Sequence, residues 1–161
     1  MTSLRSGVKM VLMKNLYSPS MLKSYLSCKY IIFNEINEKK LNLKKIELSK
    51  NDKLRLEKGN IHEKNYLKEL KKKYKKVIDI KNSDLSKEEK ISKTIQSMKE
   101  GWEVIHGGYL KRDKWRGEFD FLIINKNLKS RFGDYSYEVI DTKNSNKPKP
   151  DHIIQLGMYS Y

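Results

Sequence analysis

Two short stretches in the second half of the chain have the hydrophobic pattern of strands, and each contains an acid. Residues 117–124 read Gly-Glu-Phe-Asp-Phe-Leu-Ile-Ile, and residues 137–143, which follow a polar turn, read Tyr-Glu-Val-Ile-Asp-Thr-Lys. Successive side chains of a strand point to opposite faces of a sheet, so Asp141 and Lys143 share one face. If the two stretches pair antiparallel, Asp120 reaches the same face. The pattern therefore predicts two carboxylates and an ammonium side by side.

Apolar residues at helical spacing predict four helices around these strands. The first predicted helix begins at Pro19, after the cap Ser18, and ends near Phe33. The second covers about residues 60–76 and the third about residues 87–100, and the fourth begins near Asp151. The third helix begins with a capping box, Ser86-Lys87-Glu88-Glu89, and Gly101 supplies its C-terminal stop. The polar, lysine-rich residues 34–52 are expected to form a loop or a short exposed helix.

The remaining apolar segments predict further strands. Residues 77–80 are a short candidate, and residues 102–110 have strand character with Gly107-Gly108 inside, which indicates a bulge or the close approach of another backbone. Residues 1–17 are expected to form a strand or a loosely packed arm, because residues 1–16 have no clear period. A chain of 161 residues suits one core, so residues 18–161 are expected to form a single α/β domain.

The charge of the chain is strongly positive. It has 35 Lys and Arg residues against 20 Asp and Glu residues, which gives a formal net charge of +15. This balance suits a polyanionic partner, bound through its phosphates. The chain is also rich in lysine, asparagine and isoleucine, a bias typical of an AT-rich genome. Charge alone therefore leaves both a nucleic-acid partner and a compositional origin open.

The single cysteine, Cys28, excludes an internal disulfide framework and is compatible with a reducing cytoplasm. It falls in the first predicted helix, where we expect it to be a small buried residue. The longest apolar run, residues 30–33, is far too short to span a bilayer, and we expect neither a signal peptide nor a membrane partner.

The acids and the lysine suit a divalent-metal and phosphate site, because hard cations bind oxygen ligands and a phosphodiester binds cations. Their order, Asp120 and then Asp141-Thr142-Lys143, resembles the motif of the PD-(D/E)XK nuclease superfamily, an aspartate on one strand and acid-x-lysine on the next. The upstream Gly59-Asn60-Ile61-His62 resembles the Gly-x-x-His of RecB-like members, and Gln155-Leu156-Gly157-Met158-Tyr159 resembles their Gln-x-x-x-Tyr. Residues 98–122 resemble one largely uncharacterised RecB-like nuclease family.

The resemblance implies a restriction-endonuclease-like core, a mixed sheet flanked by helices in the order helix, three strands, helix, strand. The sequence stops at Tyr161, inside the last predicted helix, so the last core strand is expected to be missing. On this reading the chain is the front part of a longer protein or a truncated product.

The resemblance also implies roles for particular residues. One or two Mg²⁺ or Mn²⁺ ions would be held by an imidazole, two carboxylates and a backbone carbonyl, those of His62, Asp120, Asp141 and Thr142. Lys143 would orient or deprotonate the attacking water, and Gln155 and Tyr159 would contact the nucleic acid or position the lysine. Some RecB-like nucleases also bind an iron–sulfur cluster through an early cysteine and three late ones, but one cysteine cannot hold such a cluster alone.

Three functions are consistent with these residues. The leading hypothesis is a metal-dependent DNA nuclease of repair, recombination or defence, acting on single-stranded or linear duplex DNA, with a fused or associated helicase or second nuclease module. The second is a catalytically silent nucleic-acid-binding module with the same fold. The third is a lysine-rich α/β domain of unrelated function, in which His62 is a solvated or capping group, Gln155 and Tyr159 form an ordinary helix surface, and the candidate ligands do not converge.

Overall fold

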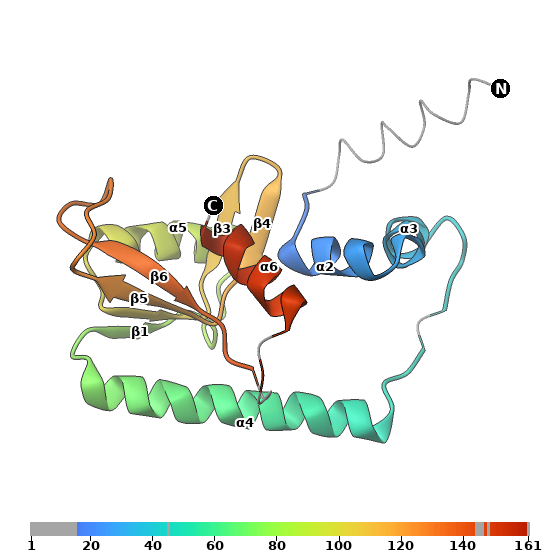
Figure 1. The fold of residues 1–161 in the computed structure, drawn as a ribbon, viewed down its shortest axis with the longest axis horizontal. Helices are drawn as coiled ribbons and strands as arrows, with labels where there is room; N and C mark the ends of the chain where they lie inside the picture. Colours follow the sequence, from blue (N-terminus) through green and yellow to red (C-terminus); the bar gives the residue numbers. More distant parts are fainter. Residues whose placement is uncertain (1–15, 45, 144–146, 148, 161) are drawn as a thin grey trace.

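The computed structural model describes residues 16–44, 46–143, 147 and 149–160. The predicted arm over residues 1–17 lies outside the described residues except at its last two positions. Within the described ranges the elements follow one another as shown in Figure 1: α2 (Pro19–Ser27), α3 (Lys29–Asn37), α4 (Lys50–Lys73), β1 (Val77–Asp79), α5 (Lys87–Lys99), β2 (Val104–His106), β3 (Tyr109–Arg112), β4 (Trp115–Glu118), β5 (Phe121–Asn125), β6 (Ser136–Ile140) and α6 (Pro150–Ser160). None of the helices in this part of the chain combines the length and the apolarity that a bilayer crossing requires.

Four strands form one mixed sheet in the order β1-β2-β5-β6. The strands β1 and β2 are parallel, whereas β5 runs antiparallel to both β2 and β6. The strands β3 and β4 form a separate antiparallel pair. The predicted class, an α/β domain with a mixed sheet flanked by helices, is confirmed.

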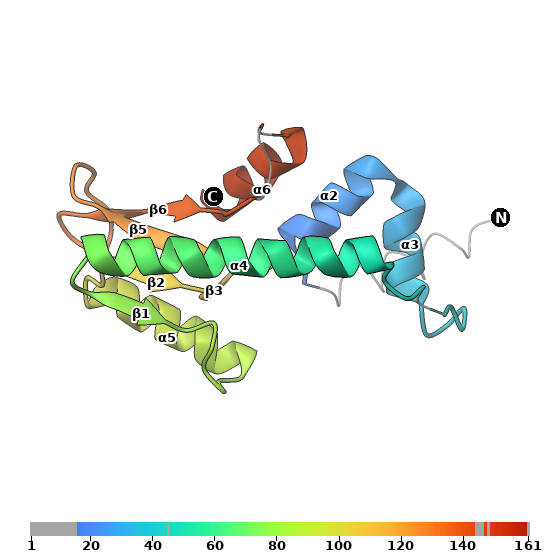
Figure 2. The same ribbon diagram turned by 90° about the horizontal axis from the view of Figure 1, so that it is seen from below.

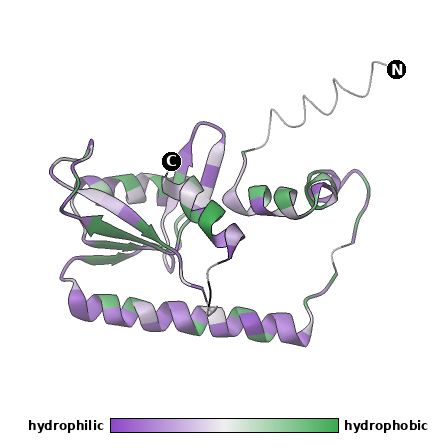
Figure 3. Ribbon diagram, viewed as in Figure 1, coloured by the Kyte–Doolittle hydropathy of each residue, from purple (hydrophilic) through white to green (hydrophobic). Residues whose placement is uncertain are grey.

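The hydrophobic core lies on both faces of this sheet, with α4 packed on one and α5 on the other. The buried residues on the two faces are Leu67, Leu70, Val104 and Phe121 beside α4, and Ile80, Met98, Ile105, Phe119 and Leu122 beside α5. Neighbours along β2 and along β5 belong to opposite clusters, as strand alternation requires. Figure 3 shows the contrast between the apolar strand β5 and the mostly polar helix α4.

The helix α4 begins earlier than predicted and runs along the length of the molecule (Figure 2). Its N-cap is Ser49, whose hydroxyl accepts a hydrogen bond from the Asp52 N–H at 3.1 Å. The prediction of a loop or short exposed helix over residues 34–52 therefore missed the start of a long helix. Its first turns expose Leu54 and Leu56 and bury no apolar stripe, so hydrophobic periodicity could not reveal them.

The helix α4 also ends earlier than predicted, because a carboxylate from another segment binds the backbone N–H groups that follow the helix. The carboxylate of Glu103 accepts hydrogen bonds from the N–H groups of Lys75 and Lys76, at 2.9 and 3.1 Å. These backbone bonds hold the pKa of Glu103 below its ordinary value. The helix ends at Lys73, and the chain turns directly into β1.

The first predicted helix is two helices, divided at Cys28. The backbone of Cys28 is extended, with φ −161° and ψ 119°, and its N–H closes α2 by bonding the Ser24 carbonyl at 2.8 Å. The expectation that Cys28 is buried is wrong: it lies at the junction of α2 and α3 and is exposed. The start after Ser18 is as predicted, since the Ser18 hydroxyl accepts from the Met21 N–H.

Two segments predicted as single strands are each broken into two, and the two breaks are joined by a backbone hydrogen bond. The segment 102–110 breaks at Gly107, which has φ +63° and where an added Cβ would overlap the side chain of Lys81. The predicted close approach of another backbone is thus confirmed. The segment 117–124 breaks between β4 and β5, and the Gly107 N–H bonds the Asp120 carbonyl at 2.8 Å. The break sets Asp120 at the edge of the sheet.

Candidate active site

The two predicted carboxylates lie opposite each other at the end of the β5–β6 pair. Asp120 directly precedes β5, and Asp141 directly follows β6. The strands are antiparallel with Phe121 opposite Ile140, so the next position in the same register brings Asp120 to Asp141. The antiparallel pairing on which the expected meeting of the two acids depended is therefore present, although Asp141 and the two residues after it lie beyond the strand itself.

Asp120 fastens the chain that leaves β6. Its Oδ2 atom accepts two hydrogen bonds from Thr142, one from the backbone N–H at 2.7 Å and one from the hydroxyl at 2.8 Å. Because one carboxylate oxygen receives both donors, Thr142 is held in position between Asp141 and Lys143. The acid-x-lysine segment is thereby fixed without being part of the sheet.

Asp141 is the buried member of the site. Its side chain is 4 % exposed, and the Lys143 Nζ atom lies 2.6 Å from its Oδ2 atom. The contact is an ion pair, and within the described residues this buried oxygen has no other polar partner. Burial raises the pKa of Asp141; Lys143 opposes the rise and the charge of Asp120 adds to it. We name Asp120, Asp141 and Lys143 the active-site cluster, in which two carboxylates face one ammonium.

Tyr159 and Gln155 of α6 lie beside this cluster. The Tyr159 hydroxyl donates a hydrogen bond to the Glu118 carbonyl, and its ring packs against Gly117, where an added Cβ would overlap it. Burial raises the pKa of Tyr159 to about 12; its contact with the Gln155 side chain lowers it, and the nearby Asp141 carboxylate raises it. The phenol is therefore a neutral hydrogen-bond donor at physiological pH.

His62 is the predicted site residue that the structure does not bring to the others. It is exposed on α4, and within the described residues no hydrogen bond or ion pair joins it to Asp120 or Asp141. The neighbouring Glu63 points inward instead, on the same stripe of the helix as Leu67. One residue along a helix turns the side chain by about 100°, so only one of the two can face the sheet.

A second group of charged side chains, not predicted from the sequence, lies at the same end of the sheet, and we name it the paired cluster: Glu63, Asp79, Lys81 and His106. The His106 ring is buried and bonds a carboxylate at each nitrogen, Asp79 Oδ1 at 2.8 Å from Nδ1 and Glu63 Oε1 at 2.9 Å from Nε2. Lys81 bonds both oxygens of Glu63, at 2.7 and 2.5 Å. One imidazole and one ammonium thus join the two carboxylates in a single connected group.

The carboxylate of Asp79 in the paired cluster accepts hydrogen bonds from two residues, Asn82 and His106. Although burial opposes its ionisation, hydrogen bonds from Asn82 and His106 hold the pKa of Asp79 below its ordinary value. The only local signal of the cluster in the sequence is an acid, Glu63, at a position of α4 where the apolar stripe calls for a hydrophobic residue.

The oxygen atoms at the active-site cluster are of the kind that Mg²⁺ or Mn²⁺ would bind. Two carboxylates and a backbone carbonyl are hard ligands, and Mg²⁺ is commonly held by one or two carboxylates with water completing its shell. Across the described part of the chain, no three His, Cys, Asp or Glu side chains form a group able to hold a metal ion.

Comparisons with models of known protein families, with curated protein sequences and with solved structures find no match to this chain. The interpretation of the site therefore depends on its own geometry and on the spacing of its motif.

Proposed function

We propose that this chain is a metal-dependent deoxyribonuclease with a RecB-like, restriction-endonuclease-like core, and that it hydrolyses phosphodiester bonds in the cytoplasm. The observation that carries the proposal is the meeting of Asp120 with the Asp141-Thr142-Lys143 segment at the end of two adjacent strands. At this strand end a buried carboxylate oxygen of Asp141 has no hydrogen-bond partner among the described residues and is met by the Lys143 ammonium at 2.6 Å. Charge clusters of this kind occur at functional sites more often than elsewhere.

The residues at the strand ends fit a divalent cation. The buried Asp141 Oδ2 atom has no hydrogen-bond partner among the described residues, and its carboxylate has a raised pKa because it is desolvated beside Asp120. The carboxylates of Asp120 and Asp141 and the carbonyl of Thr142 would hold Mg²⁺ or Mn²⁺. When bound, such an ion lowers the pKa of a coordinated water and polarises a phosphoryl oxygen.

Lys143 supplies the positive charge that the chain itself brings to the reaction. Its side chain is 34 % exposed, so the ammonium can meet a phosphate from solvent while it remains in contact with Asp141. There it would orient the attacking water and offset negative charge that develops on the phosphoryl oxygens. Tyr159, which is hydrogen-bonded to the Glu118 carbonyl, and Gln155 would position the DNA strand beside Lys143.

The test is a cleavage assay with linear duplex and single-stranded DNA. The wild-type protein should degrade DNA with Mn²⁺ and stop when a chelator is added. The double variant Asp120→Asn, Asp141→Asn should be inactive with the same circular dichroism spectrum as wild type. DNA degradation that persists in the chelator, or in the double variant, would contradict the proposal.

A catalytically silent DNA-binding module is the second candidate, and one observation favours it. His62, the remaining predicted ligand, is exposed on α4 and, among the described residues, does not join Asp120 and Asp141 in a group of three possible metal ligands. Such a module would bind DNA through its net charge of +15 with a steep salt dependence and without a divalent ion. Binding that is unchanged by Mn²⁺, with no cleavage under any metal, would select this candidate.

A further inference from the structure

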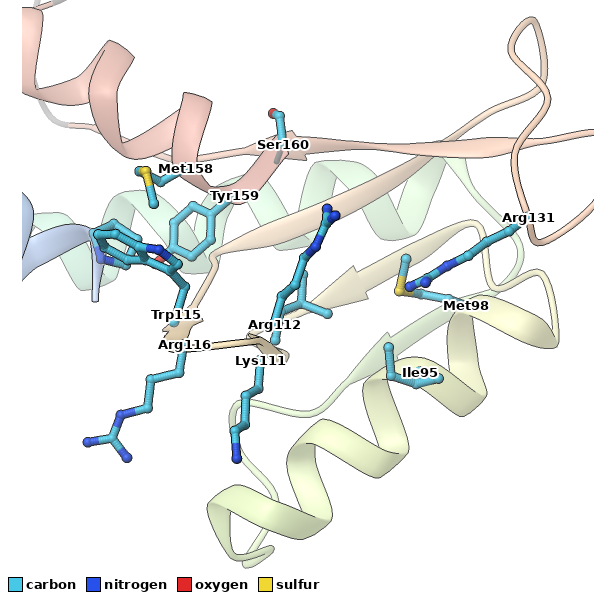
Figure 4. A pocket seen from close by; sticks show the side chains of 13 residues that line it. Ile95, Met98, Lys111, Arg112, Trp115, Arg116, Arg131, Met158, Tyr159 and Ser160 are labelled. Atoms are coloured by element: carbon cyan, nitrogen blue, oxygen red, sulfur yellow. The ribbon is translucent and has the colours of Figure 1, made fainter. Parts of the chain in front are cut away.

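A hollow of about 560 Å³ lies between the β3–β4 hairpin, α5 and α6 (Figure 4). Its volume is within the range of pockets that bind small organic groups. Four of its lining side chains are cationic, and none of the described residues that line it is acidic; the cations are Lys111, Arg112, Arg116 and Arg131. Such a surface attracts an anionic ligand and repels a cationic one.

The cations are placed unequally around this hollow. In Figure 4 Arg112 extends upward from the hairpin and Arg131 extends from the β5–β6 loop toward Met98, whereas Lys111 and Arg116 point the other way from Arg112. A guanidinium presents a planar fork of donors that matches two phosphate oxygens. Arg112 and Arg131 are therefore suited to a phosphate within the hollow.

The opposite wall is aromatic and apolar. Trp115 and Tyr159 lie on one side of the hollow with Met158 above them (Figure 4). The indole is half-buried, and its ring centroid lies 5.5 Å from that of Tyr17, which supports it from outside the hollow. A supported aromatic ring next to guanidinium groups offers a stacking surface for a nucleobase and donors for its phosphate.

The hollow is connected to the active-site cluster through Tyr159. The ring of Tyr159 lines the hollow, while its hydroxyl bonds the carbonyl of Glu118, two positions before Asp120. Gly117 also lines the hollow and lets this ring lie against the backbone of β4. The hollow and the active-site cluster thus share the side chain of Tyr159, whose pKa is also raised by the nearby Asp141 carboxylate.

We propose that this hollow binds one unpaired nucleotide of a DNA strand, with the base against Trp115 and a phosphate between Arg112 and Arg131. The identity of the ligand as DNA rests on the proposed nuclease function. The ligand is unpaired because both faces of a base inside a duplex are covered by its neighbours, and entry into the hollow would require extrusion. The site thus favours single-stranded ends over blunt duplex.

Fluorescence of Trp115 reports on this site directly. The chain has two tryptophans, so a Trp102→Phe background leaves Trp115 as the only indole. In a chelator, which prevents metal-dependent cleavage, a short oligothymidylate should quench this fluorescence, and a blunt duplex of equal length should not. No quenching by the single strand, or equal quenching by the duplex, would overturn the proposal.

A pair of matched variants in one loop tests the phosphate contact. Arg131→Gln should weaken the affinity for oligothymidylate about tenfold, the size expected for the loss of a charged contact with a strand. Lys129→Gln should leave it unchanged, because Lys129 is 83 % exposed, pairs with Asp134 and does not line the hollow. Equal losses in both variants would mean that only net charge matters and would overturn the proposal.

The outcomes for this site and for the nuclease are separable. Quenching together with an inactive cleavage assay would contradict the nuclease and support the nucleotide site. Cleavage without quenching would contradict the nucleotide site alone.

Discussion

The paired cluster and the active-site cluster lie at the same edge of one sheet and differ in how their charges are met. Asp79 and His106 end the parallel strands β1 and β2, and Asp120 and Asp141 flank the antiparallel strands β5 and β6 at that edge. In the paired cluster both nitrogens of His106 have a carboxylate partner. In the active-site cluster a buried oxygen of Asp141 lacks a hydrogen bond.

Under the proposed function, this difference separates a structural role from a functional one. Buried charges that are mutually satisfied hold elements together, and here they fasten α4 to the end of the sheet through Glu63. A desolvated carboxylate beside a second one is unfavourable for the isolated fold, and proteins retain such arrangements where function requires them. The four predictions that follow test this division, beginning with the largest expected effect.

Of the two lysines that contact a buried acid, only Lys143 should matter for the rate of cleavage. Lys143→Ala should lower DNA cleavage about a thousandfold, because it removes the charge that faces the reacting phosphate. Lys81→Ala should keep wild-type cleavage wherever the protein is folded, since the Lys81 ammonium pairs with Glu63 and, among the described residues, forms no ion pair with Asp120 or Asp141. Initial rates with Mn²⁺ measure both effects. Equal activity in Lys143→Ala and wild type would remove the mechanism assigned to the lysine.

Loss of Glu63 should cost stability rather than chemistry. Glu63→Ala should lower the free energy of unfolding by about 3 kcal/mol, because it leaves the buried His106 ring without one of its two partners. The residue is 7 % exposed, so water cannot replace the lost carboxylate. Urea unfolding followed by circular dichroism gives the value. A change in cleavage rate without a change in stability would place Glu63 in the catalytic machinery instead.

Asp141→Asn should stabilise the fold while it abolishes cleavage. The pKa of Asp141 is raised above its ordinary value of 3.8, so at intermediate pH the native state binds more protons than the unfolded state. Stability is therefore lost as pH rises from about 3.8 through the native pKa.

The asparagine variant lacks this loss. Its free energy of unfolding should match that of wild type near pH 3 and exceed it by about 1 kcal/mol at neutral pH, a usual gain when a charge retained for function is removed. Thermal unfolding across this pH range is the measurement. A variant less stable than wild type at neutral pH would show that the carboxylate is satisfied in the fold.

His62→Ala should have the smallest effect on stability, below about 0.5 kcal/mol, because an exposed side chain without partners contributes little. The same variant decides the predicted ligand role. A cleavage rate equal to wild type would confine the metal's side-chain ligands to Asp120 and Asp141, whereas a large loss would restore His62 as a ligand despite its position on α4.

Patterns of a few neighbouring residues predicted the features that depend on interactions between those same residues. The strand pattern predicted Asp141 beside Lys143, and the two do meet, although both lie beyond the end of β6. The β5–β6 pairing brings Asp120 to the same place. The capping box at Ser86 and Glu89 forms as predicted, because both of its hydrogen bonds lie within four residues.

Contacts between distant segments were beyond local patterns. The bond between Glu63 and His106 joins residues 43 positions apart, and nothing in either neighbourhood indicates the other. The choice of Glu63 over His62 as the inward residue depends on the rotation of α4 about its axis. That rotation is set by the packing of Leu67 and Leu70 on the sheet, which the motif spacing does not contain.

The proposed function requires that the active-site cluster bind a divalent cation, and calorimetric titration with Mn²⁺ measures this binding directly. Two aspartates at the same edge of the sheet form a matched pair for the experiment. Wild type and Asp79→Asn should bind Mn²⁺ with similar affinity, whereas Asp141→Asn should lose the binding. Undiminished Mn²⁺ binding by Asp141→Asn, or no binding by the wild type, would contradict the assignment of this cluster as a nuclease site.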